Sequence, residues 1–146
     1  MASSEHFSDA ELCCHHIVQT VDTNGIPTFS PCNKLGATQE LVDALEQLRL
    51  IVARPILVNS AYRCPQHPLT LARPDSMHAK GKAADIRVRG MTARELYREA
   101  QKVAAFHGFG VDDHRNYLHV DVRPSSLGRI SRWIYGLDGQ TLPWDA

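Results

Sequence analysis

The stretch from Ser76 to Asp85 combines the side chains of a metal site with the residues of a tight turn. His78 precedes Asp85 by seven positions, and Gly81 lies between them. Two residues seven apart cannot approach each other on a straight strand, because a strand rises about 3.3 Å per residue. A reversal at Gly81 would bring them together, since glycine tolerates the backbone angles of a tight turn. The spacing therefore predicts a metal-binding loop that leads directly into a strand.

A second strand is expected to bring a third ligand to the same place. Residues 85–89 alternate between polar and apolar types, which puts Asp85 on the polar face of its strand. Residues 117–123 alternate in the same way and put His119 and Asp121 on a polar face. Two imidazoles and one carboxylate, with a fourth position open to water, form the ligand set of a catalytic zinc site. The candidate ligands of one zinc ion per chain are His78, Asp85 and His119.

Three motifs of the chain resemble those of the zinc D-alanyl-D-alanine carboxypeptidases and murein endopeptidases, which share a fold with the hedgehog signalling domain. The motifs are Ser-x-His-x-x-Gly-x-Ala-x-Asp at residues 76–85, the pair Tyr62-Arg63, and the triplet at residues 119–121. The resemblance covers about residues 6–133 and is strongest to the small single-domain branch that includes phage lysins. It implies an α+β fold in which a small, mainly antiparallel sheet packs against helices.

The resemblance also implies a substrate and the residues that bind it. The family cleaves peptide bonds in the stem peptides of bacterial peptidoglycan, either as a carboxypeptidase or as an endopeptidase. Its Tyr-Arg arginine holds the peptide near the metal, which makes Arg63 a candidate catalytic and substrate-binding residue, with Tyr62 and Ser76 beside it. Judged from the residues alone, the alternative for Arg63 is a structural ion pair or a solvated side chain.

The general base has several candidates, because the chain departs from the family at one position. Several family members carry an acid three residues before the last histidine ligand, where this chain has Asn116, which cannot act as a base. Asp121 is the first candidate because it shares a strand face with His119, Asp113 is the second and Asp112 the third. Asp121 could instead orient a ligand imidazole. The rival function is a non-catalytic zinc module of the same fold, used for binding or in a virion structure.

Composition limits the other partners. The 146 residues, 43% of them hydrophobic, predict a single domain with a core over about residues 6–134 and a C-terminal tail at 135–146. Sixteen basic residues balance sixteen acidic ones, which argues against nucleic acid or an anionic membrane as partner. We expect a monomer. With neither a signal peptide nor a transmembrane run in the sequence, we expect synthesis in the cytoplasm and action at the cell wall, after phage-lysin-like release or from a virion.

The four cysteines are Cys13, Cys14, Cys32 and Cys64, and their spacing matches no Cys-x-x-Cys knuckle. Free or structural thiols are the favoured interpretation. A disulfide is one alternative, and a second metal held together with His15 and His16 is another.

Capping and periodicity signals predict three helices and five strands. Ser8 and Thr92 each open a capping box, and apolar residues at helical spacing follow Thr38. The predicted helices run from Ser8 to about residue 18, from Thr38 to before Pro55, and from Thr92 to about residue 107. The predicted strands lie at 55–59, 85–89, 109–111, 117–122 and 132–135, the last at a sheet edge, with glycine- and proline-rich loops at 22–36 and 66–75.

Overall fold

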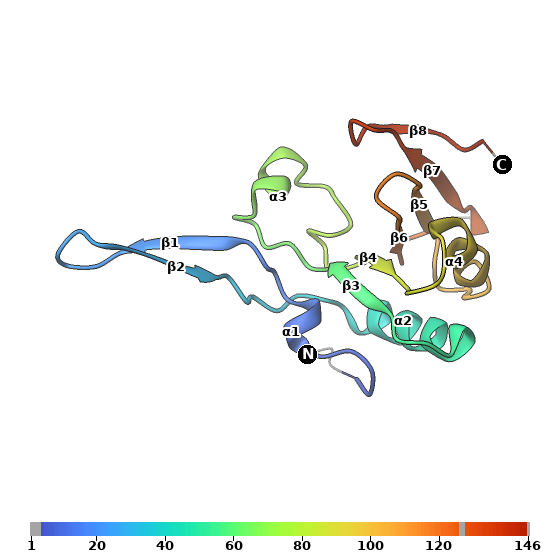
Figure 1. The fold of residues 1–146 in the computed structure, drawn as a ribbon, viewed down its shortest axis with the longest axis horizontal. Helices are drawn as coiled ribbons and strands as arrows, with labels where there is room; N and C mark the ends of the chain where they lie inside the picture. Colours follow the sequence, from blue (N-terminus) through green and yellow to red (C-terminus); the bar gives the residue numbers. More distant parts are fainter. Residues whose placement is uncertain (1–3, 126–127, 146) are drawn as a thin grey trace.

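A mixed six-stranded sheet forms the centre of the protein in a computed structural model that describes residues 4–125 and 128–145 (Figure 1). The strand order is β3-β4-β6-β5-β7-β8. Neighbouring strands are antiparallel except β5 and β7, which run parallel. The strands are β3 (Leu57–Ser60), β4 (Ala83–Arg87), β5 (Gly108–Asp112), β6 (Tyr117–Asp121), β7 (Ser131–Tyr135) and β8 (Thr141–Pro143).

Two helices, α2 (Gln39–Val52) and α4 (Ala93–Ala100), pack with one face of the sheet to form the core. Thr38 caps α2, and Thr92 opens the predicted capping box of α4. Every second residue of the central strands points into this core, including Ile86, Leu118 and Val120. The opposite face of β4 and β6 is therefore left to Asp85 and His119. The predicted α+β fold with a mainly antiparallel sheet is confirmed.

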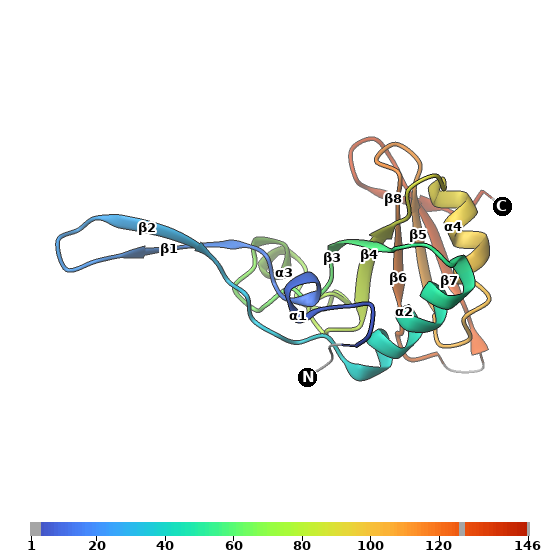
Figure 2. The same ribbon diagram turned by 60° about the horizontal axis from the view of Figure 1, so that its bottom comes forward.

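The N-terminal third differs from the prediction. Helix α1 (Asp9–Leu12) spans a single turn. A hairpin of β1 (Ile17–Val21) and β2 (Pro27–Pro31) replaces the predicted end of this helix and part of the loop predicted at 22–36. The turn residue Gly25 has a φ of +77°, which glycine adopts without strain. The hairpin extends away from the body as an arm (Figure 1, Figure 2). The second predicted loop contains the short helix α3 (Pro68–Ala72), which begins with proline at its first position.

The C-terminal half also departs from the prediction. The last helix ends at Ala100 rather than near 107, and β5 begins at Gly108. The segment predicted as a loose tail forms β8, so that β8 and not β7 is the sheet edge. Trp144 packs on Tyr97 with ring centroids 4.8 Å apart. Apolar contact therefore holds the end of the chain against α4. Within residues 4–125 and 128–145, no helix combines the length and apolarity needed to cross a lipid bilayer.

Candidate metal centre

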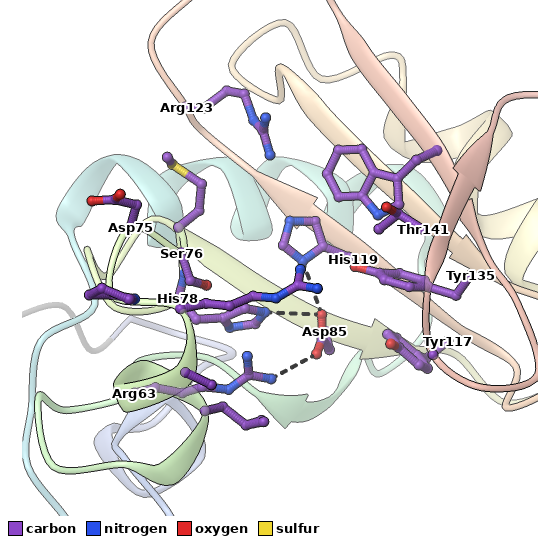
Figure 3. A pocket seen from close by; sticks show the side chains of 17 residues that line it. Arg63, Asp75, Ser76, His78, Asp85, Tyr117, His119, Arg123, Tyr135 and Thr141 are labelled. Carbon is purple, nitrogen blue, oxygen red and sulfur yellow. Dashed lines mark hydrogen bonds and ion pairs between the residues drawn. The ribbon is translucent and has the colours of Figure 1, made fainter.

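The three predicted ligands converge at the junction of β4, β6 and the turn before β4 (Figure 3). Asp85 lies directly opposite His119 in the antiparallel register of β4 and β6. Its Oδ1 is 3.2 Å from His78 Nε2 and 3.2 Å from His119 Nδ1. The turn that brings His78 back depends on Gly81, which has a φ of +72° and lies against a backbone carbonyl. The strand register and one glycine therefore assemble the group.

The donor atoms fit a divalent metal ion. In a tetrahedral site with metal–ligand distances of about 2.0–2.1 Å, ligand atoms lie about 3.3 Å apart. The two 3.2 Å separations match this value. Only 3% of His78, 9% of Asp85 and 6% of His119 is exposed, so the three side chains are fixed by packing. Nitrogen and carboxylate donors in this number leave a fourth position free on the cavity side.

Each imidazole is held in the tautomer that metal binding needs. His78 Nδ1 lies 2.7 Å from the carbonyl oxygen of Ala61, which can only accept, so Nδ1 carries the proton and Nε2 is free. His119 Nε2 lies 2.7 Å from Asp121 Oδ2 and donates to it, so Nδ1 is the nitrogen that faces Asp85. Outer hydrogen bonds of this kind fix the ring orientation of metal ligands.

Burial and mutual contacts set the protonation of the three groups. Burial lowers the pKa of His78, which favours its neutral form. Burial opposes ionisation of Asp85, but its contacts with His78 and His119 outweigh that effect and hold the pKa of Asp85 well below its usual range. Burial also lowers the pKa of His119, but hydrogen bonds to Asp121 and Asp85 outweigh it and raise that pKa. Asp85 is therefore an anionic ligand at neutral pH.

Asp121 lies behind His119 and is 0% exposed. Besides His119, its oxygens accept from the backbone N, Nε and Nη2 of Arg123 at 3.1, 2.8 and 2.7 Å. Gly108, its partner across β5 and β6, leaves room for the carboxylate, since a Cβ there would lie 2.3 Å from Oδ1. With its acceptor positions taken by protein groups, Asp121 is placed to orient His119 rather than to contact a substrate.

The predicted substrate-binding residues divide into two groups. Arg63 lines a cavity of about 770 Å³ in front of the three ligands, and its Nη2 lies 3.3 Å from Asp85 Oδ2. Ser76 also lines this cavity, and its Oγ accepts from the backbone N of His78 at 3.2 Å. Tyr62 instead packs its ring over Gly36, where a Cβ would lie 2.5 Å from it. The ion pair expected as an alternative for Arg63 is thus formed within the site itself.

Aromatic residues that the sequence analysis missed form the opposite wall of the cavity. Trp133 packs on His119 with ring centroids 5.1 Å apart, and Tyr117 and Tyr135 lie beside it (Figure 3). Burial raises the pKa of Tyr117 and raises that of Tyr135 to about 12, so both phenols stay protonated. The alternation that placed His119 on the polar face could also have identified Tyr117. The parallel pairing of β5 with β7 brings Trp133 and Tyr135 to the cavity, and no local pattern in the sequence indicates this pairing.

The other two predicted bases, Asp113 and Asp112, are not among the described residues that line this cavity. Asp113 pairs with Arg94 at 2.8 Å, and the buried Asp112 pairs with Arg115 at 2.7 Å. Asn116 accepts from the backbone N of Ala93 at 2.8 Å, so it helps to hold the start of α4. An exposed carboxylate that the prediction did not include, Asp75, does line the cavity.

A comparison with protein-family models finds one whose description is Peptidase M15, and it matches residues 5–121. The match includes the three candidate ligands together with Arg63 and Asp121. No curated protein matches the chain. The matched region ends at the last residue of β6, so β7, which carries Trp133 and Tyr135, lies beyond it.

Proposed function

This chain belongs to the peptidase M15 family, and we propose that it is a zinc-dependent peptidase acting on the stem peptides of bacterial peptidoglycan. The observation that carries the proposal is the convergence of His78, Asp85 and His119 at the floor of a cavity. Asp85 Oδ1 lies 3.2 Å from a ring nitrogen of each histidine, and all three donor atoms lie within 4.8 Å of one another. Family membership makes the chain a metal-dependent peptidase. Zinc is the metal that best suits two imidazoles and one carboxylate with an open position.

Zinc bound here would lower the pKa of a water molecule and polarise the scissile carbonyl. The chain's own residues supply the remaining requirements. Tyr117 and Tyr135 keep their protons and can donate hydrogen bonds to negative charge that develops on the carbonyl oxygen. Asp121 keeps His119 in the productive tautomer. Asp75, at the rim of the cavity, is our candidate for the carboxylate that takes the water proton.

The charges of the cavity suit a peptide that carries carboxylates. Arg63, Arg73 and Arg123 all line it, against the acids Asp75 and Asp85. Asp85 would be neutralised in part by the metal, which leaves a net positive wall. A planar guanidinium binds a carboxylate through two parallel hydrogen bonds. The terminal carboxylate of a stem peptide is therefore a suitable ligand, which supports carboxypeptidase action, while the open cavity also admits the longer chain that an endopeptidase needs.

The test is incubation of the purified protein with bacterial sacculi, followed by mass spectrometry of the muropeptides. We expect new peptide ends, no product after chelation of the metal, and no product with His78→Ala. Synthetic stem peptides with a free or an amidated C-terminus separate the two reactions, because only a carboxypeptidase requires the free carboxylate. Zinc-loaded protein that releases nothing from either substrate would refute the peptidase proposal.

The second candidate is a non-catalytic metal module, and one observation favours it. The family position that often carries an acid is Asn116, whose side chain holds the start of α4, and Asp121 is enclosed by Arg123 and His119. Turnover by the wild-type protein separates the two functions, and an Asp75→Asn variant tests the base. Loss of turnover with unchanged zinc content supports catalysis with Asp75 as base. We further propose that the protein acts as a monomer at the cell wall, after phage-lysin-like release or as part of a virion.

A further inference from the structure

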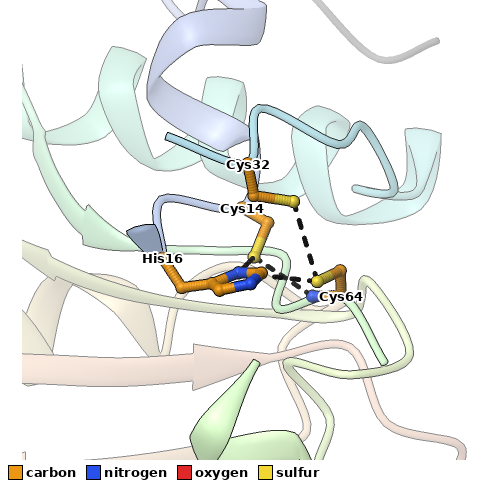
Figure 4. Close-up of side chains that lie close together, drawn as sticks. All are labelled: Cys14, His16, Cys32 and Cys64. Atoms are coloured by element: carbon orange, nitrogen blue, oxygen red, sulfur yellow. Dashed lines mark hydrogen bonds between the residues drawn. The ribbon is translucent and has the colours of Figure 1, made fainter. Parts of the chain in front are cut away.

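A second group of metal-ligand side chains lies where the β1–β2 arm joins the body (Figure 4). Cys14 and His16 lie between α1 and β1, Cys32 follows β2, and Cys64 follows β3. Their donor atoms all lie within 4.8 Å of one another. Three separate segments of the chain therefore contribute to one cluster, and none of its members takes part in the site described above.

The separations within the cluster match a tetrahedral ion better than a disulfide. Sulfur ligands about 2.3 Å from zinc lie about 3.8 Å apart, and a sulfur and a nitrogen ligand about 3.5 Å apart. Cys32 Sγ is 3.7 Å from Cys64 Sγ, and His16 Nδ1 is 3.5 Å from Cys64 Sγ and 3.1 Å from Cys14 Sγ. A disulfide needs sulfur atoms about 2.05 Å apart.

The surroundings of the cluster favour thiolates that share a cation. The backbone N of Cys64 donates to Cys14 Sγ at 3.3 Å, a contact that stabilises negative charge on the sulfur. Cys14 and Cys64 are both 0% exposed, and a buried thiolate requires a positive partner. The neighbouring Cys13 and His15 behave differently, because their side chains contact the carbonyl oxygen of Ala10 and not the cluster.

We propose that Cys14, His16, Cys32 and Cys64 bind a structural zinc ion, separate from the candidate catalytic site. Three thiolates and one imidazole fill a tetrahedral zinc site and leave no open position, which is the character of structural sites. The ion would join the base of the arm to the segment after β3. Cys64 directly follows Arg63, whose guanidinium contacts Asp85, so the ion would brace the segment that carries Arg63.

Metal counting on paired variants tests this proposal. We expect wild-type protein purified with zinc to hold about two ions per chain, and both Cys32→Ser and His78→Ala to hold about one. Cys13→Ser is the control, since Cys13 is a neighbouring free cysteine that lies outside the cluster, and it should keep the wild-type zinc content. Equal zinc content in Cys32→Ser and Cys13→Ser would overturn the proposal. A loss confined to Cys32→Ser would leave it standing while refuting the zinc site of the proposed function.

Two measurements that need no cysteine variant guard against cysteine variants that fail to fold. Cobalt exchanged into wild-type protein should show a thiolate-to-cobalt charge-transfer band in the near ultraviolet. This band should persist in His78→Ala, because the catalytic candidates include no cysteine. Thiol titration of chelated, denatured protein should find all four cysteines reduced. Absence of the charge-transfer band, or a deficit of two thiols from a Cys32–Cys64 disulfide, would overturn the proposal.

Discussion

Replacing Asp121 distinguishes an orienting carboxylate from a general base. The side chain is 0% exposed and accepts from His119 Nε2 at 2.7 Å, with Arg123 on its other side. Asp121→Asn keeps the shape and can keep one hydrogen bond to His119, but it removes the negative charge that makes the imidazole a stronger ligand. Asp121→Ala removes the hydrogen bond as well. Both variants should weaken metal binding before they affect any chemical step.

The size of the effect follows from this contact. Loss of an outer partner of a metal-bound histidine typically costs 10- to 100-fold in metal affinity, about 1.4 to 2.7 kcal/mol. We expect Asp121→Asn near the lower value and Asp121→Ala near the upper one. Both variants also leave Arg123 without its partner. Because 30% of the Arg123 side chain is exposed, solvent reduces that part of the loss, and we expect the fold to persist.

Competition with a chelator of known zinc affinity measures the change, and turnover is then measured at saturating zinc. We expect Asp121→Asn to regain most of its kcat when zinc is in excess, because the reacting atoms do not touch Asp121. Asp113→Asn is the control, since Asp113 pairs with Arg94 away from the cavity. If Asp121→Asn has unchanged zinc affinity and a low kcat that excess zinc does not restore, the orienting role is refuted and Asp121 is the general base.

Three further predictions concern stability and the support of the site. Gly81 and Gly25 have φ of +72° and +77°, but only a Cβ on Gly81 meets backbone, at 1.9 Å. In urea denaturation, Gly81→Ala should therefore lower the free energy of unfolding by at least about 3 kcal/mol, and Gly25→Ala should lower it by about 1 kcal/mol. Equal losses of stability in the two variants would contradict this expectation. Gly108→Ala should displace Asp121 and lower zinc affinity in a chelator titration about as much as Asp121→Asn, and wild-type affinity would refute the contact. Burial raises the pKa of Glu46, but hydrogen bonds from the N-terminal segment outweigh it and lower that pKa, so Glu46→Gln should cost about 1 kcal/mol at pH 7. That difference should shrink as the pH falls below about 4.3, where the carboxyl of the unfolded chain takes up its proton, and should be lost below the lowered pKa of the folded protein; a difference independent of pH would contradict the assignment.

Local signals in the sequence determined several elements correctly. The capping box at Thr92 begins α4, and the apolar stripe after Thr38 forms α2. Alternation placed Asp85 and His119 on the same face, because side chains on a strand point to opposite sides in turn. One prediction failed although a local signal was present. The hairpin at Ile17–Pro31 was predicted as helix and loop, although its Asn-Gly turn was a hairpin signal.

The sequence by itself determined the types and order of the three candidate ligands, since their spacing around Gly81 and their strand positions are local properties. Only the tertiary structure decided what surrounds them. The pairing of β5 with β7 brings Trp133 against His119. The tertiary structure also brings Cys14 and Cys64, which are fifty positions apart, into one cluster. Such neighbours meet only when the chain closes long loops, and no local pattern records which loops will close.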